Sequence, residues 1–183
     1  MLKHQLNVVS DRFFTLVYQY LRPQLMYESI YDIDFGRLWD DGVRHLIFDV
    51  DNTLITYSDS DVSIQCINLF KSIQSIGFES IILMSNNSSI DRIGRVAKQL
   101  DLPAITFACK PFVFTMRRLL NERSMNCHEV ALIGDQLLTD VLLANKLNII
   151  SIFVDPMDIG QLSYLKNFQY SFQRWVLQSF YRF

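Results

Sequence analysis

The sequence has few of the residues that mark several large classes of protein. Its 183 residues include six glycines and four prolines and no low-complexity tract, which argues against disordered and fibrous proteins. Three cysteines without a Cys-x-x-Cys spacing argue against a disulfide framework, and three scattered histidines argue against a zinc site. We therefore expect reduced thiols and one compact domain, since half of the residues are hydrophobic.

The sequence also lacks long runs of like charge and long hydrophobic runs. The 17 basic and 19 acidic residues leave a net charge of −2, so no overall basic field argues for nucleic-acid binding. No apolar stretch reaches the roughly 18 residues of a membrane-spanning helix, because charges such as Arg12 and Arg22 interrupt them. No small-residue cleavage site follows the N-terminal segment, which argues against a secretory signal. These features predict a cytoplasmic protein, with peripheral contact to a membrane left open.

Short apolar runs alternate with amphipathic stretches from residue 44 to residue 156. Strands that are buried on both faces are continuously apolar, so this alternation predicts an α/β protein with a Rossmann-like, doubly wound parallel sheet of about five strands. The predicted strands are 45–50, 80–85, 104–109, 129–134 and 148–154, and the predicted helices are 62–76, 90–100, 112–121 and 138–147. Residues 44–156 are the predicted catalytic core.

The two flanking segments differ from the core. Residues 1–43 are predicted to form an N-terminal helical appendage, with a helix over 12–21 followed by an acidic loop over 32–41. Residues 157–183 form a basic, aromatic tail, in which 161–183 contain three basic and no acidic residues. Two interpretations of the tail stay open, namely packing on the sheet or against a second copy, and contact with an anionic membrane. Its apolar stripe at helical spacing comprises Leu165, Phe168, Phe172, Trp175 and Val176.

Polar residues follow the predicted strands at their carboxyl ends, where open parallel sheets bind ligands. Asp49 and Asp51 lie two residues apart, so their side chains share one face. Two carboxylates about 4 Å apart repel each other by about 4 kcal/mol at an effective dielectric constant near 20, which predicts a divalent cation. Hard oxygen ligands favour Mg²⁺. The other polar residues at these strand ends are Asn52, Thr53, Ser85, Asn86, Asn87, Lys110, Asp135 and Asp140.

Four segments, DVDNTL, LMSNNS, CKP and GDQLLTD, together resemble the motifs of haloacid dehalogenase-like phosphohydrolases. The segments DNTL, SNN and YDID are similar to those of the subfamily IIIA phosphatases related to phosphatidylglycerophosphate phosphatase. The resemblance covers roughly Tyr27 to Pro156. It implies hydrolysis of a phosphomonoester with magnesium through an aspartyl phosphate.

The resemblance also implies catalytic roles for four residues. Asp49 is expected to attack phosphorus, and Asp51 to protonate the leaving oxygen and then to activate water. Ser85 and Lys110 are expected to bind the phosphoryl group, and the lysine to neutralise its developing charge.

Substrate and metal binding are implied for further positions. Thr53 and Asn86 are expected to bind the substrate, although an asparagine at this position can also simply form a turn. Asp140 stands near a helix start, where a carboxylate also stabilises the helix dipole. The expected magnesium ligands are Asp49, the backbone carbonyl of Asp51 and Asp135, with Asp140 as an outer-shell carboxylate.

The intervals between motifs are too short for a separate cap domain, since 54–80 holds little more than one helix. An open site favours a bulky substrate, and phosphatidylglycerophosphate is the preferred one from the resemblance. The alternatives are a phosphoprotein, nucleotide or sugar phosphate as substrate, or a phospho-accepting receiver module. Receivers carry their accepting aspartate after the third strand, where this chain has Cys109 and Lys110. The oligomeric state stays open.

Overall fold

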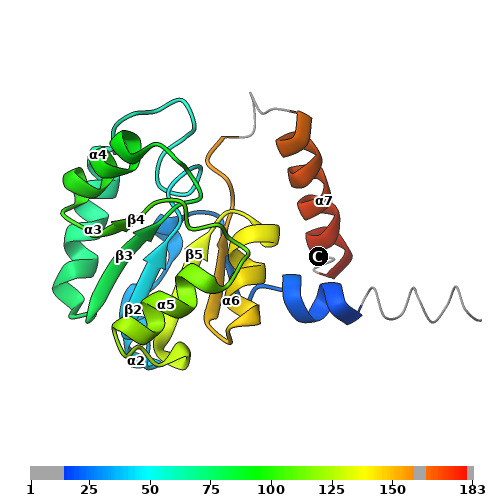
Figure 1. The fold of residues 1–183 in the computed structure, drawn as a ribbon, viewed down its shortest axis with the longest axis horizontal. Coiled ribbons are helices and arrows are strands. Elements are labelled where there is room, and N and C mark those ends of the chain that lie inside the picture. Colours follow the sequence, from blue (N-terminus) through cyan, green and yellow to red (C-terminus); the bar gives the residue numbers. More distant parts are fainter. Residues whose placement is uncertain (1–14, 159–163, 181–183) are drawn as a thin grey trace, which may run out of the picture.

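A parallel sheet of six strands lies at the centre of the protein in the computed structural model, which describes residues 15–158 and 164–180 (Figure 1). The strand order is β1-β6-β5-β2-β3-β4. The strands are β1 (Leu25–Tyr27), β2 (His45–Phe48), β3 (Ser80–Met84), β4 (Ala104–Ile105), β5 (Val130–Gly134) and β6 (Ile150–Val154). The predicted α/β class with a parallel sheet is confirmed, with six strands in place of about five.

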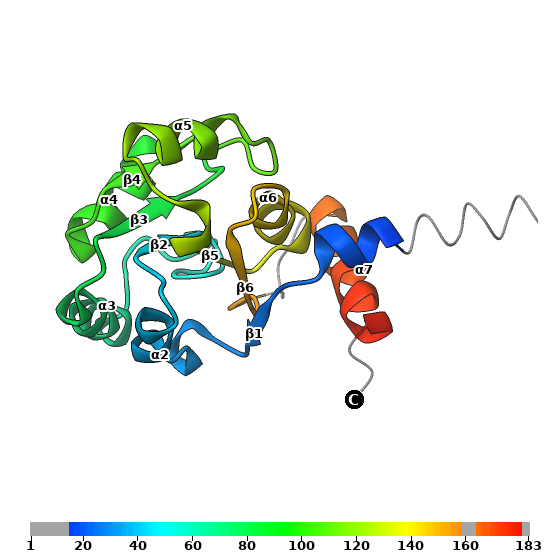
Figure 2. The same ribbon diagram turned by 90° about the horizontal axis from the view of Figure 1, so that it is seen from below.

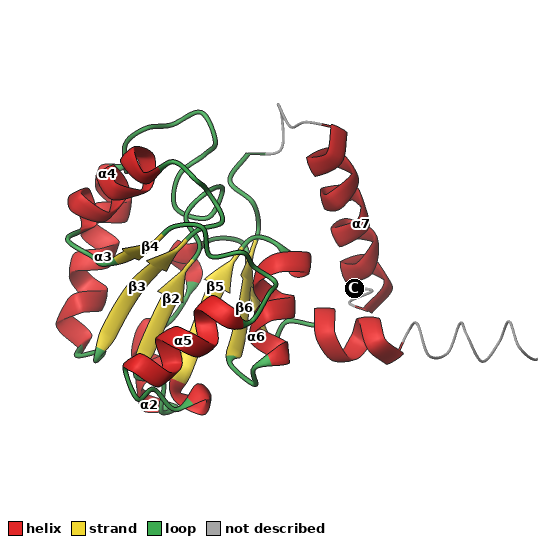
Figure 3. Cartoon of the chain, viewed as in Figure 1, coloured by secondary structure: helices red, strands yellow, loops and turns green. Residues whose placement is uncertain are grey.

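Helices cover both faces of this sheet (Figures 2 and 3). They are α2 (Phe35–Asp40), α3 (Ile64–Ile76), α4 (Ile90–Leu100), α5 (Phe114–Glu122), α6 (Leu142–Lys146) and α7 (Tyr164–Phe180). Short turns are η1 (Ile30–Asp32), η2 (Cys127–Glu129) and the π-helical η3 (Leu137–Val141). Among the helices of the described residues, none combines the length and the apolar character needed to cross a bilayer.

Alternation along the strands divides the core into two layers. Leu46 and Phe48 of β2 pack with α2, α3 and α4, whereas Ile47 faces α5 and α6. Successive side chains of a strand point to opposite faces, so a strand covered on both sides needs an unbroken apolar run. This is why the continuous runs in the sequence predict β2, β3, β5 and β6.

The strand order reverses between β2 and β5. The chain proceeds from β2 to β3 and β4 on one side, and then returns to β5 and β6 on the other. Such a reversal opens a crevice at the carboxyl ends of the two central strands, where α/β sheets bind ligands. Asp49 follows β2 directly and Asp135 follows β5 directly, so both lie at this crevice.

The predicted strand 104–109 is much shorter in the structure. β4 ends at Ile105, and Phe107 and Cys109 adopt left-handed backbone conformations with φ of 51° and 55°, which a strand cannot contain. Lys110 therefore comes from a loop. The other elements differ by a few residues at their ends, and the predicted helix 138–147 is η3 followed by α6.

The sixth strand, β1, lies inside the segment predicted as an appendage. It pairs in parallel with β6, and its apolar run, Leu25 to Tyr27, is only three residues long, which is too short to predict a strand. The predicted acidic loop is also wrong, because η1 and α2 occupy it and the Asp34 side chain caps α2 by accepting from the Arg37 N–H at 2.9 Å. The division into appendage, core and tail stays a prediction, and residues 1–14 lie outside the described residues.

The tail forms helix α7, which packs beside the helical residues 15–21 (Figure 2). Val176 of α7 joins Val17 and Phe153 in a third apolar cluster. The inward face differs from the predicted stripe, because Gln173 is buried while Phe168 and Trp175 are 74% and 44% exposed. A polar residue faces inward because backbone groups next to β5 need partners there; the side chain of Leu165 lies outside the described residues.

Candidate active site

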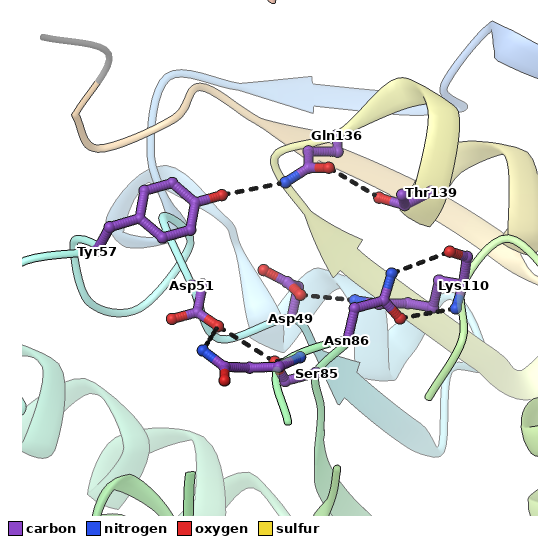
Figure 4. Close-up of a pocket in the computed structure, with 9 residues that line it drawn as sticks. Asp49, Asp51, Tyr57, Ser85, Asn86, Lys110, Gln136 and Thr139 are labelled. Carbon is purple, nitrogen blue, oxygen red and sulfur yellow. Dashed lines mark hydrogen bonds and ion pairs between the residues drawn. The ribbon is translucent and has the colours of Figure 1, made fainter. Parts of the chain in front are cut away.

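Lys110 is the centre of the polar cluster beyond the strands (Figure 4). Its buried ammonium group donates to Asp49 Oδ1 at 2.6 Å, to Asp140 Oδ1 at 2.6 Å and to the Met84 carbonyl at 2.9 Å. Burial lowers the pKa of Lys110, but the charges of Asp140 and Asp49 outweigh it and raise the pKa above its ordinary value. The lysine is therefore a fixed positive charge beside Asp49.

Three buried carboxylates surround this lysine. One oxygen each of Asp49, Asp135 and Asp140 lies within 4.8 Å of the other two. Burial first, and then the neighbouring carboxylates, raise the pKa of Asp135, while burial raises the pKa of Asp49 against the opposing charge of Lys110. The combined negative charge of three carboxylates exceeds the positive charge of one lysine, and clustered oxygen donors suit a hard divalent cation. The donor set thus fits magnesium.

Asp140 is held more firmly than an outer-shell role requires. Its Oδ2 accepts from the Gln136 N–H and from the Thr139 hydroxyl, each at 3.2 Å, while Oδ1 accepts from Lys110. A Cβ at Gly134 would lie 2.4 Å from its Cγ, so only glycine leaves room for this carboxylate. Asp140 therefore orients Lys110, and its relation to the metal stays a prediction.

Thr53 connects two of the carboxylates. Its hydroxyl lies 3.1 Å from Asp49 Oδ2 and 3.5 Å from Asp135 Oδ1. The intervening turn is closed by backbone hydrogen bonds to Val50, and Asn52 adopts φ of 70° within it. Thr53 thus orients Asp49 in this geometry, and its predicted contact with substrate stays a prediction.

The carboxylate of Asp51 has a different set of partners. It accepts from the Ser85 hydroxyl at 3.2 Å, from Asn87 Nδ2 at 3.0 Å and from Arg92 Nε at 3.0 Å. Arg92 also donates to the carbonyls of Thr56 and Asp59, which joins the loop after β2 to Asp51. Asp51 and Ser85 line the same cavity as Asp49, as the strand-end positions predict.

Sequence reasoning missed Arg92, although one signal points to it. The residue lies in the first turn of α4, where the N–H groups of the helix disfavour a positive charge. A cation in such a position indicates a specific anionic partner, here Asp51.

The amide of Asn86 positions Lys110 through the backbone. Asn86 Oδ1 accepts from the Lys110 N–H at 2.7 Å, and its Nδ2 donates to the Lys110 carbonyl at 2.9 Å. Because Lys110 comes from a loop rather than from a strand, this pair replaces the missing sheet hydrogen bonds. The predicted contact of Asn86 with substrate stays a prediction, and the side chain does border the cavity.

These groups open into a cavity of about 250 Å³. Tyr57 and Gln136 form its opposite wall, and the Gln136 amide donates to the Tyr57 hydroxyl at 3.4 Å (Figure 4). No sequence signal marked these two residues, since an aromatic residue in a loop and a glutamine before a helix are both common. The lining residues are Asp49, Asp51, Tyr57, Ser85, Asn86, Asn87, Lys110, Gln136 and Thr139.

Comparison with known proteins finds similar sequences among phosphatases. A family model described as mitochondrial PGP phosphatase matches residues 11–157. A probable phosphatase, YqeG of Bacillus subtilis (strain 168), is 26% identical over 164 residues, which cover 90% of this chain and 94% of that protein. An uncharacterized protein from Listeria monocytogenes serotype 4b shares the fold with a TM-score of 0.54 and 17% identity, over 66% of this chain and 85% of the other.

Proposed function

The chain belongs to the mitochondrial PGP phosphatase family and is a haloacid dehalogenase-like phosphatase, and from this premise we propose that it hydrolyses phosphatidylglycerophosphate with the help of magnesium. One observation carries the proposal. A buried aspartate, Asp49, faces a cavity at the reversal point of the sheet, with one lysine and two further carboxylates beside it. This combination supplies a nucleophile, a positive charge and a cation site in one place.

In the first step, an Asp49 oxygen attacks the phosphorus atom and forms an aspartyl phosphate while the ester P–O bond breaks. Asp51, protonated for this step, gives its proton to the leaving oxygen. The ammonium group of Lys110 and the hydroxyl of Ser85 bind the phosphoryl oxygens as negative charge moves onto them.

In the second step, Asp51 takes a proton from a water molecule, which attacks the aspartyl phosphate and releases inorganic phosphate and Asp49. Arg92 and Asn87 hold the carboxylate of Asp51 in place during both steps. Asp49, Asp135 and the Asp51 carbonyl would hold magnesium, which when bound neutralises phosphoryl charge.

Purified protein tests the activity and the substrate together. We expect phosphate release with magnesium from phosphatidylglycerophosphate in mixed micelles, at a higher kcat/KM than from a nucleotide, a sugar phosphate or a phosphopeptide. A clear preference for one of these other phosphomonoesters would replace the lipid as substrate. No release from any of them would contradict the proposed activity.

Removal of divalent metal is expected to abolish turnover and to lower stability. Because the carboxylates repel one another when no cation is bound, magnesium should raise the unfolding temperature, and a chelator should reverse the rise. Asp135→Ala should reduce both the activity and this magnesium-dependent shift. Calorimetric unfolding with magnesium or chelator measures the effect, and full turnover in chelator would exclude the metal.

The cavity and its surroundings support a lipid substrate. A polar cavity of about 250 Å³ has room for a phosphorylated headgroup but not for acyl chains. The loop that carries Lys110 and the first residue of α5 present three phenylalanines, Phe107, Phe112 and Phe114, with exposed fractions of 55%, 62% and 74%. Beside this loop, Arg117 and Arg118 are exposed on α5, where Arg118 pairs with Glu122. We call residues 106–114 the phenylalanine loop, and we propose that it contacts an anionic membrane beside the site.

Vesicle binding tests the phenylalanine loop against the tail. The variant Phe112→Ser/Phe114→Ser should lose most of its co-sedimentation with phosphatidylcholine vesicles that contain phosphatidylglycerol, because two apolar anchors are removed. The matched variant Phe168→Ser/Trp175→Ser changes two exposed aromatics of α7 and should bind like wild type. Loss in the α7 variant alone would support the sequence-based prediction of tail contact. Both double variants should keep the turnover of a water-soluble phosphomonoester.

A further inference from the structure

Helix α7 lies beyond the end of the family match at residue 157, yet it reaches the proposed active site. Three of its side chains contact residues after β5. Gln169 donates to Gln136 Oε1 at 2.7 Å, Tyr170 donates to Asp135 Oδ2 at 2.5 Å, and Gln173 donates to the Asp135 carbonyl at 2.8 Å. All three contacts lie on the inward face of the helix.

Tyr170 joins two loops of the site through one hydroxyl. It donates to Asp135, and it accepts from Asn52 Nδ2 at 3.0 Å. Asn52 stands between Asp51 and Thr53, is fully buried, and also exchanges two hydrogen bonds with the backbone of Asp158. A phenol is protonated at neutral pH, so the Tyr170 hydroxyl donates to the carboxylate of Asp135.

Gln173 fixes the backbone on either side of the same carboxylate. While its Nε2 donates to the Asp135 carbonyl, its Oε1 accepts from the Leu137 N–H at 2.8 Å. The side chain is only 3% exposed. A buried amide whose two ends are both used holds one geometry, because leaving either end unpaired is costly.

The two carboxylate oxygens of Asp135 therefore have different partners. Oδ2 is occupied by the phenol of Tyr170, and Oδ1 faces Thr53, whose hydroxyl also contacts Asp49. Turning the plane of the carboxylate away would break the bond to Tyr170, so one oxygen is kept toward the acidic cluster. Outer groups that orient a ligand in this way commonly determine metal affinity.

We propose that Tyr170, supported by Gln173, is a positioning residue that orients Asp135 toward the divalent cation, and that α7 is therefore a part of the active site. The inference rests on the proposed function in that Asp135 binds the cation. It assigns the basic, aromatic tail a role inside the protein.

Magnesium binding measured by titration calorimetry tests the proposal without reference to turnover. Tyr170→Phe removes a single hydroxyl, and we expect the dissociation constant for magnesium to rise by about tenfold or more. The magnesium concentration for half-maximal activity should rise by the same factor, while kcat at saturating magnesium changes little. Tyr18→Phe, which removes an exposed hydroxyl that contacts Arg22 on the N-terminal helix, should leave the magnesium affinity unchanged.

A second variant separates positioning from general packing. Val176→Ala weakens the apolar contact of α7 but keeps the Tyr170 hydroxyl, so it should lower the unfolding temperature more than it lowers magnesium affinity. If Tyr170→Phe binds magnesium like wild type, or if both variants lose affinity in proportion to stability, the positioning role is wrong. Failure of the wild-type protein to bind magnesium would instead overturn the proposed metal site, and the inference with it.

Discussion

Asp49→Asn is expected to reduce phosphate release by at least about 10⁴-fold, because a carboxamide is a far poorer nucleophile toward phosphorus and cannot form the aspartyl phosphate. The fold should survive, since asparagine has nearly the same shape and its carbonyl can accept from Lys110. Removing one of three neighbouring negative charges should even raise the unfolding temperature in chelator. Phosphate release at saturating magnesium and calorimetric unfolding measure the two effects.

The matched control for this variant is Asp91→Asn. Asp91 is an exposed aspartate in the first turn of α4, so its replacement should leave turnover within about twofold of wild type. Turnover by Asp49→Asn at a similar level would contradict the nucleophilic role. Asp51→Asn should slow both proton transfers, and mass spectrometry should then detect phosphate on Asp49. Phosphate on another residue would assign the nucleophile elsewhere.

Lys110→Met is expected to lower kcat/KM by about 100-fold or more, because the phosphoryl oxygens lose their fixed positive charge. The same change should destabilise the protein by about 3–5 kcal/mol in chelator, since it leaves buried carboxylates without their partner. Magnesium should restore part of that stability, because a bound cation replaces some of the lost charge. Steady-state kinetics and urea unfolding, each with magnesium or chelator, measure these changes.

Lys98→Met provides the comparison for Lys110. Lys98 is exposed in the last turn of α4, and its replacement should change neither kcat/KM nor the urea midpoint appreciably. An effect of Lys110→Met below about threefold on kcat/KM would limit Lys110 to a structural ion pair with Asp49 and Asp140.

Local sequence patterns were sufficient to predict most strands of the sheet and the polar residues at their ends. Doubly buried strands require continuous apolar runs, and ligand sites lie beyond the carboxyl ends of parallel strands. Asp49, Ser85 and Asp135 could therefore be placed together from the sequence. β1 could not be predicted, because its apolar run of three residues is too short to indicate a strand.

The partners of these residues were harder to predict. Lys110 was expected at the end of a strand, but left-handed conformations at Phe107 and Cys109 end β4 early, and Asn86 holds the lysine instead. Arg92 lies in a helix rather than at a strand end, so a search of strand ends passes over it. Which long side chain reaches a given carboxylate depends on how two elements pack, and that is not a local property.

The sequence by itself determined the α/β class, the order of most elements and the line of polar residues that meets at the crevice, because burial and strand alternation are local constraints on side-chain type. Only the tertiary structure decided that the tail joins this site. Tyr170 is 35 residues from Asp135 along the chain, and its aromatic surroundings equally suit a packing face or a membrane contact. The contact forms because the backbone and the carboxylate beyond β5 are buried and need hydrogen-bond donors, a requirement that exists only once α7 covers them.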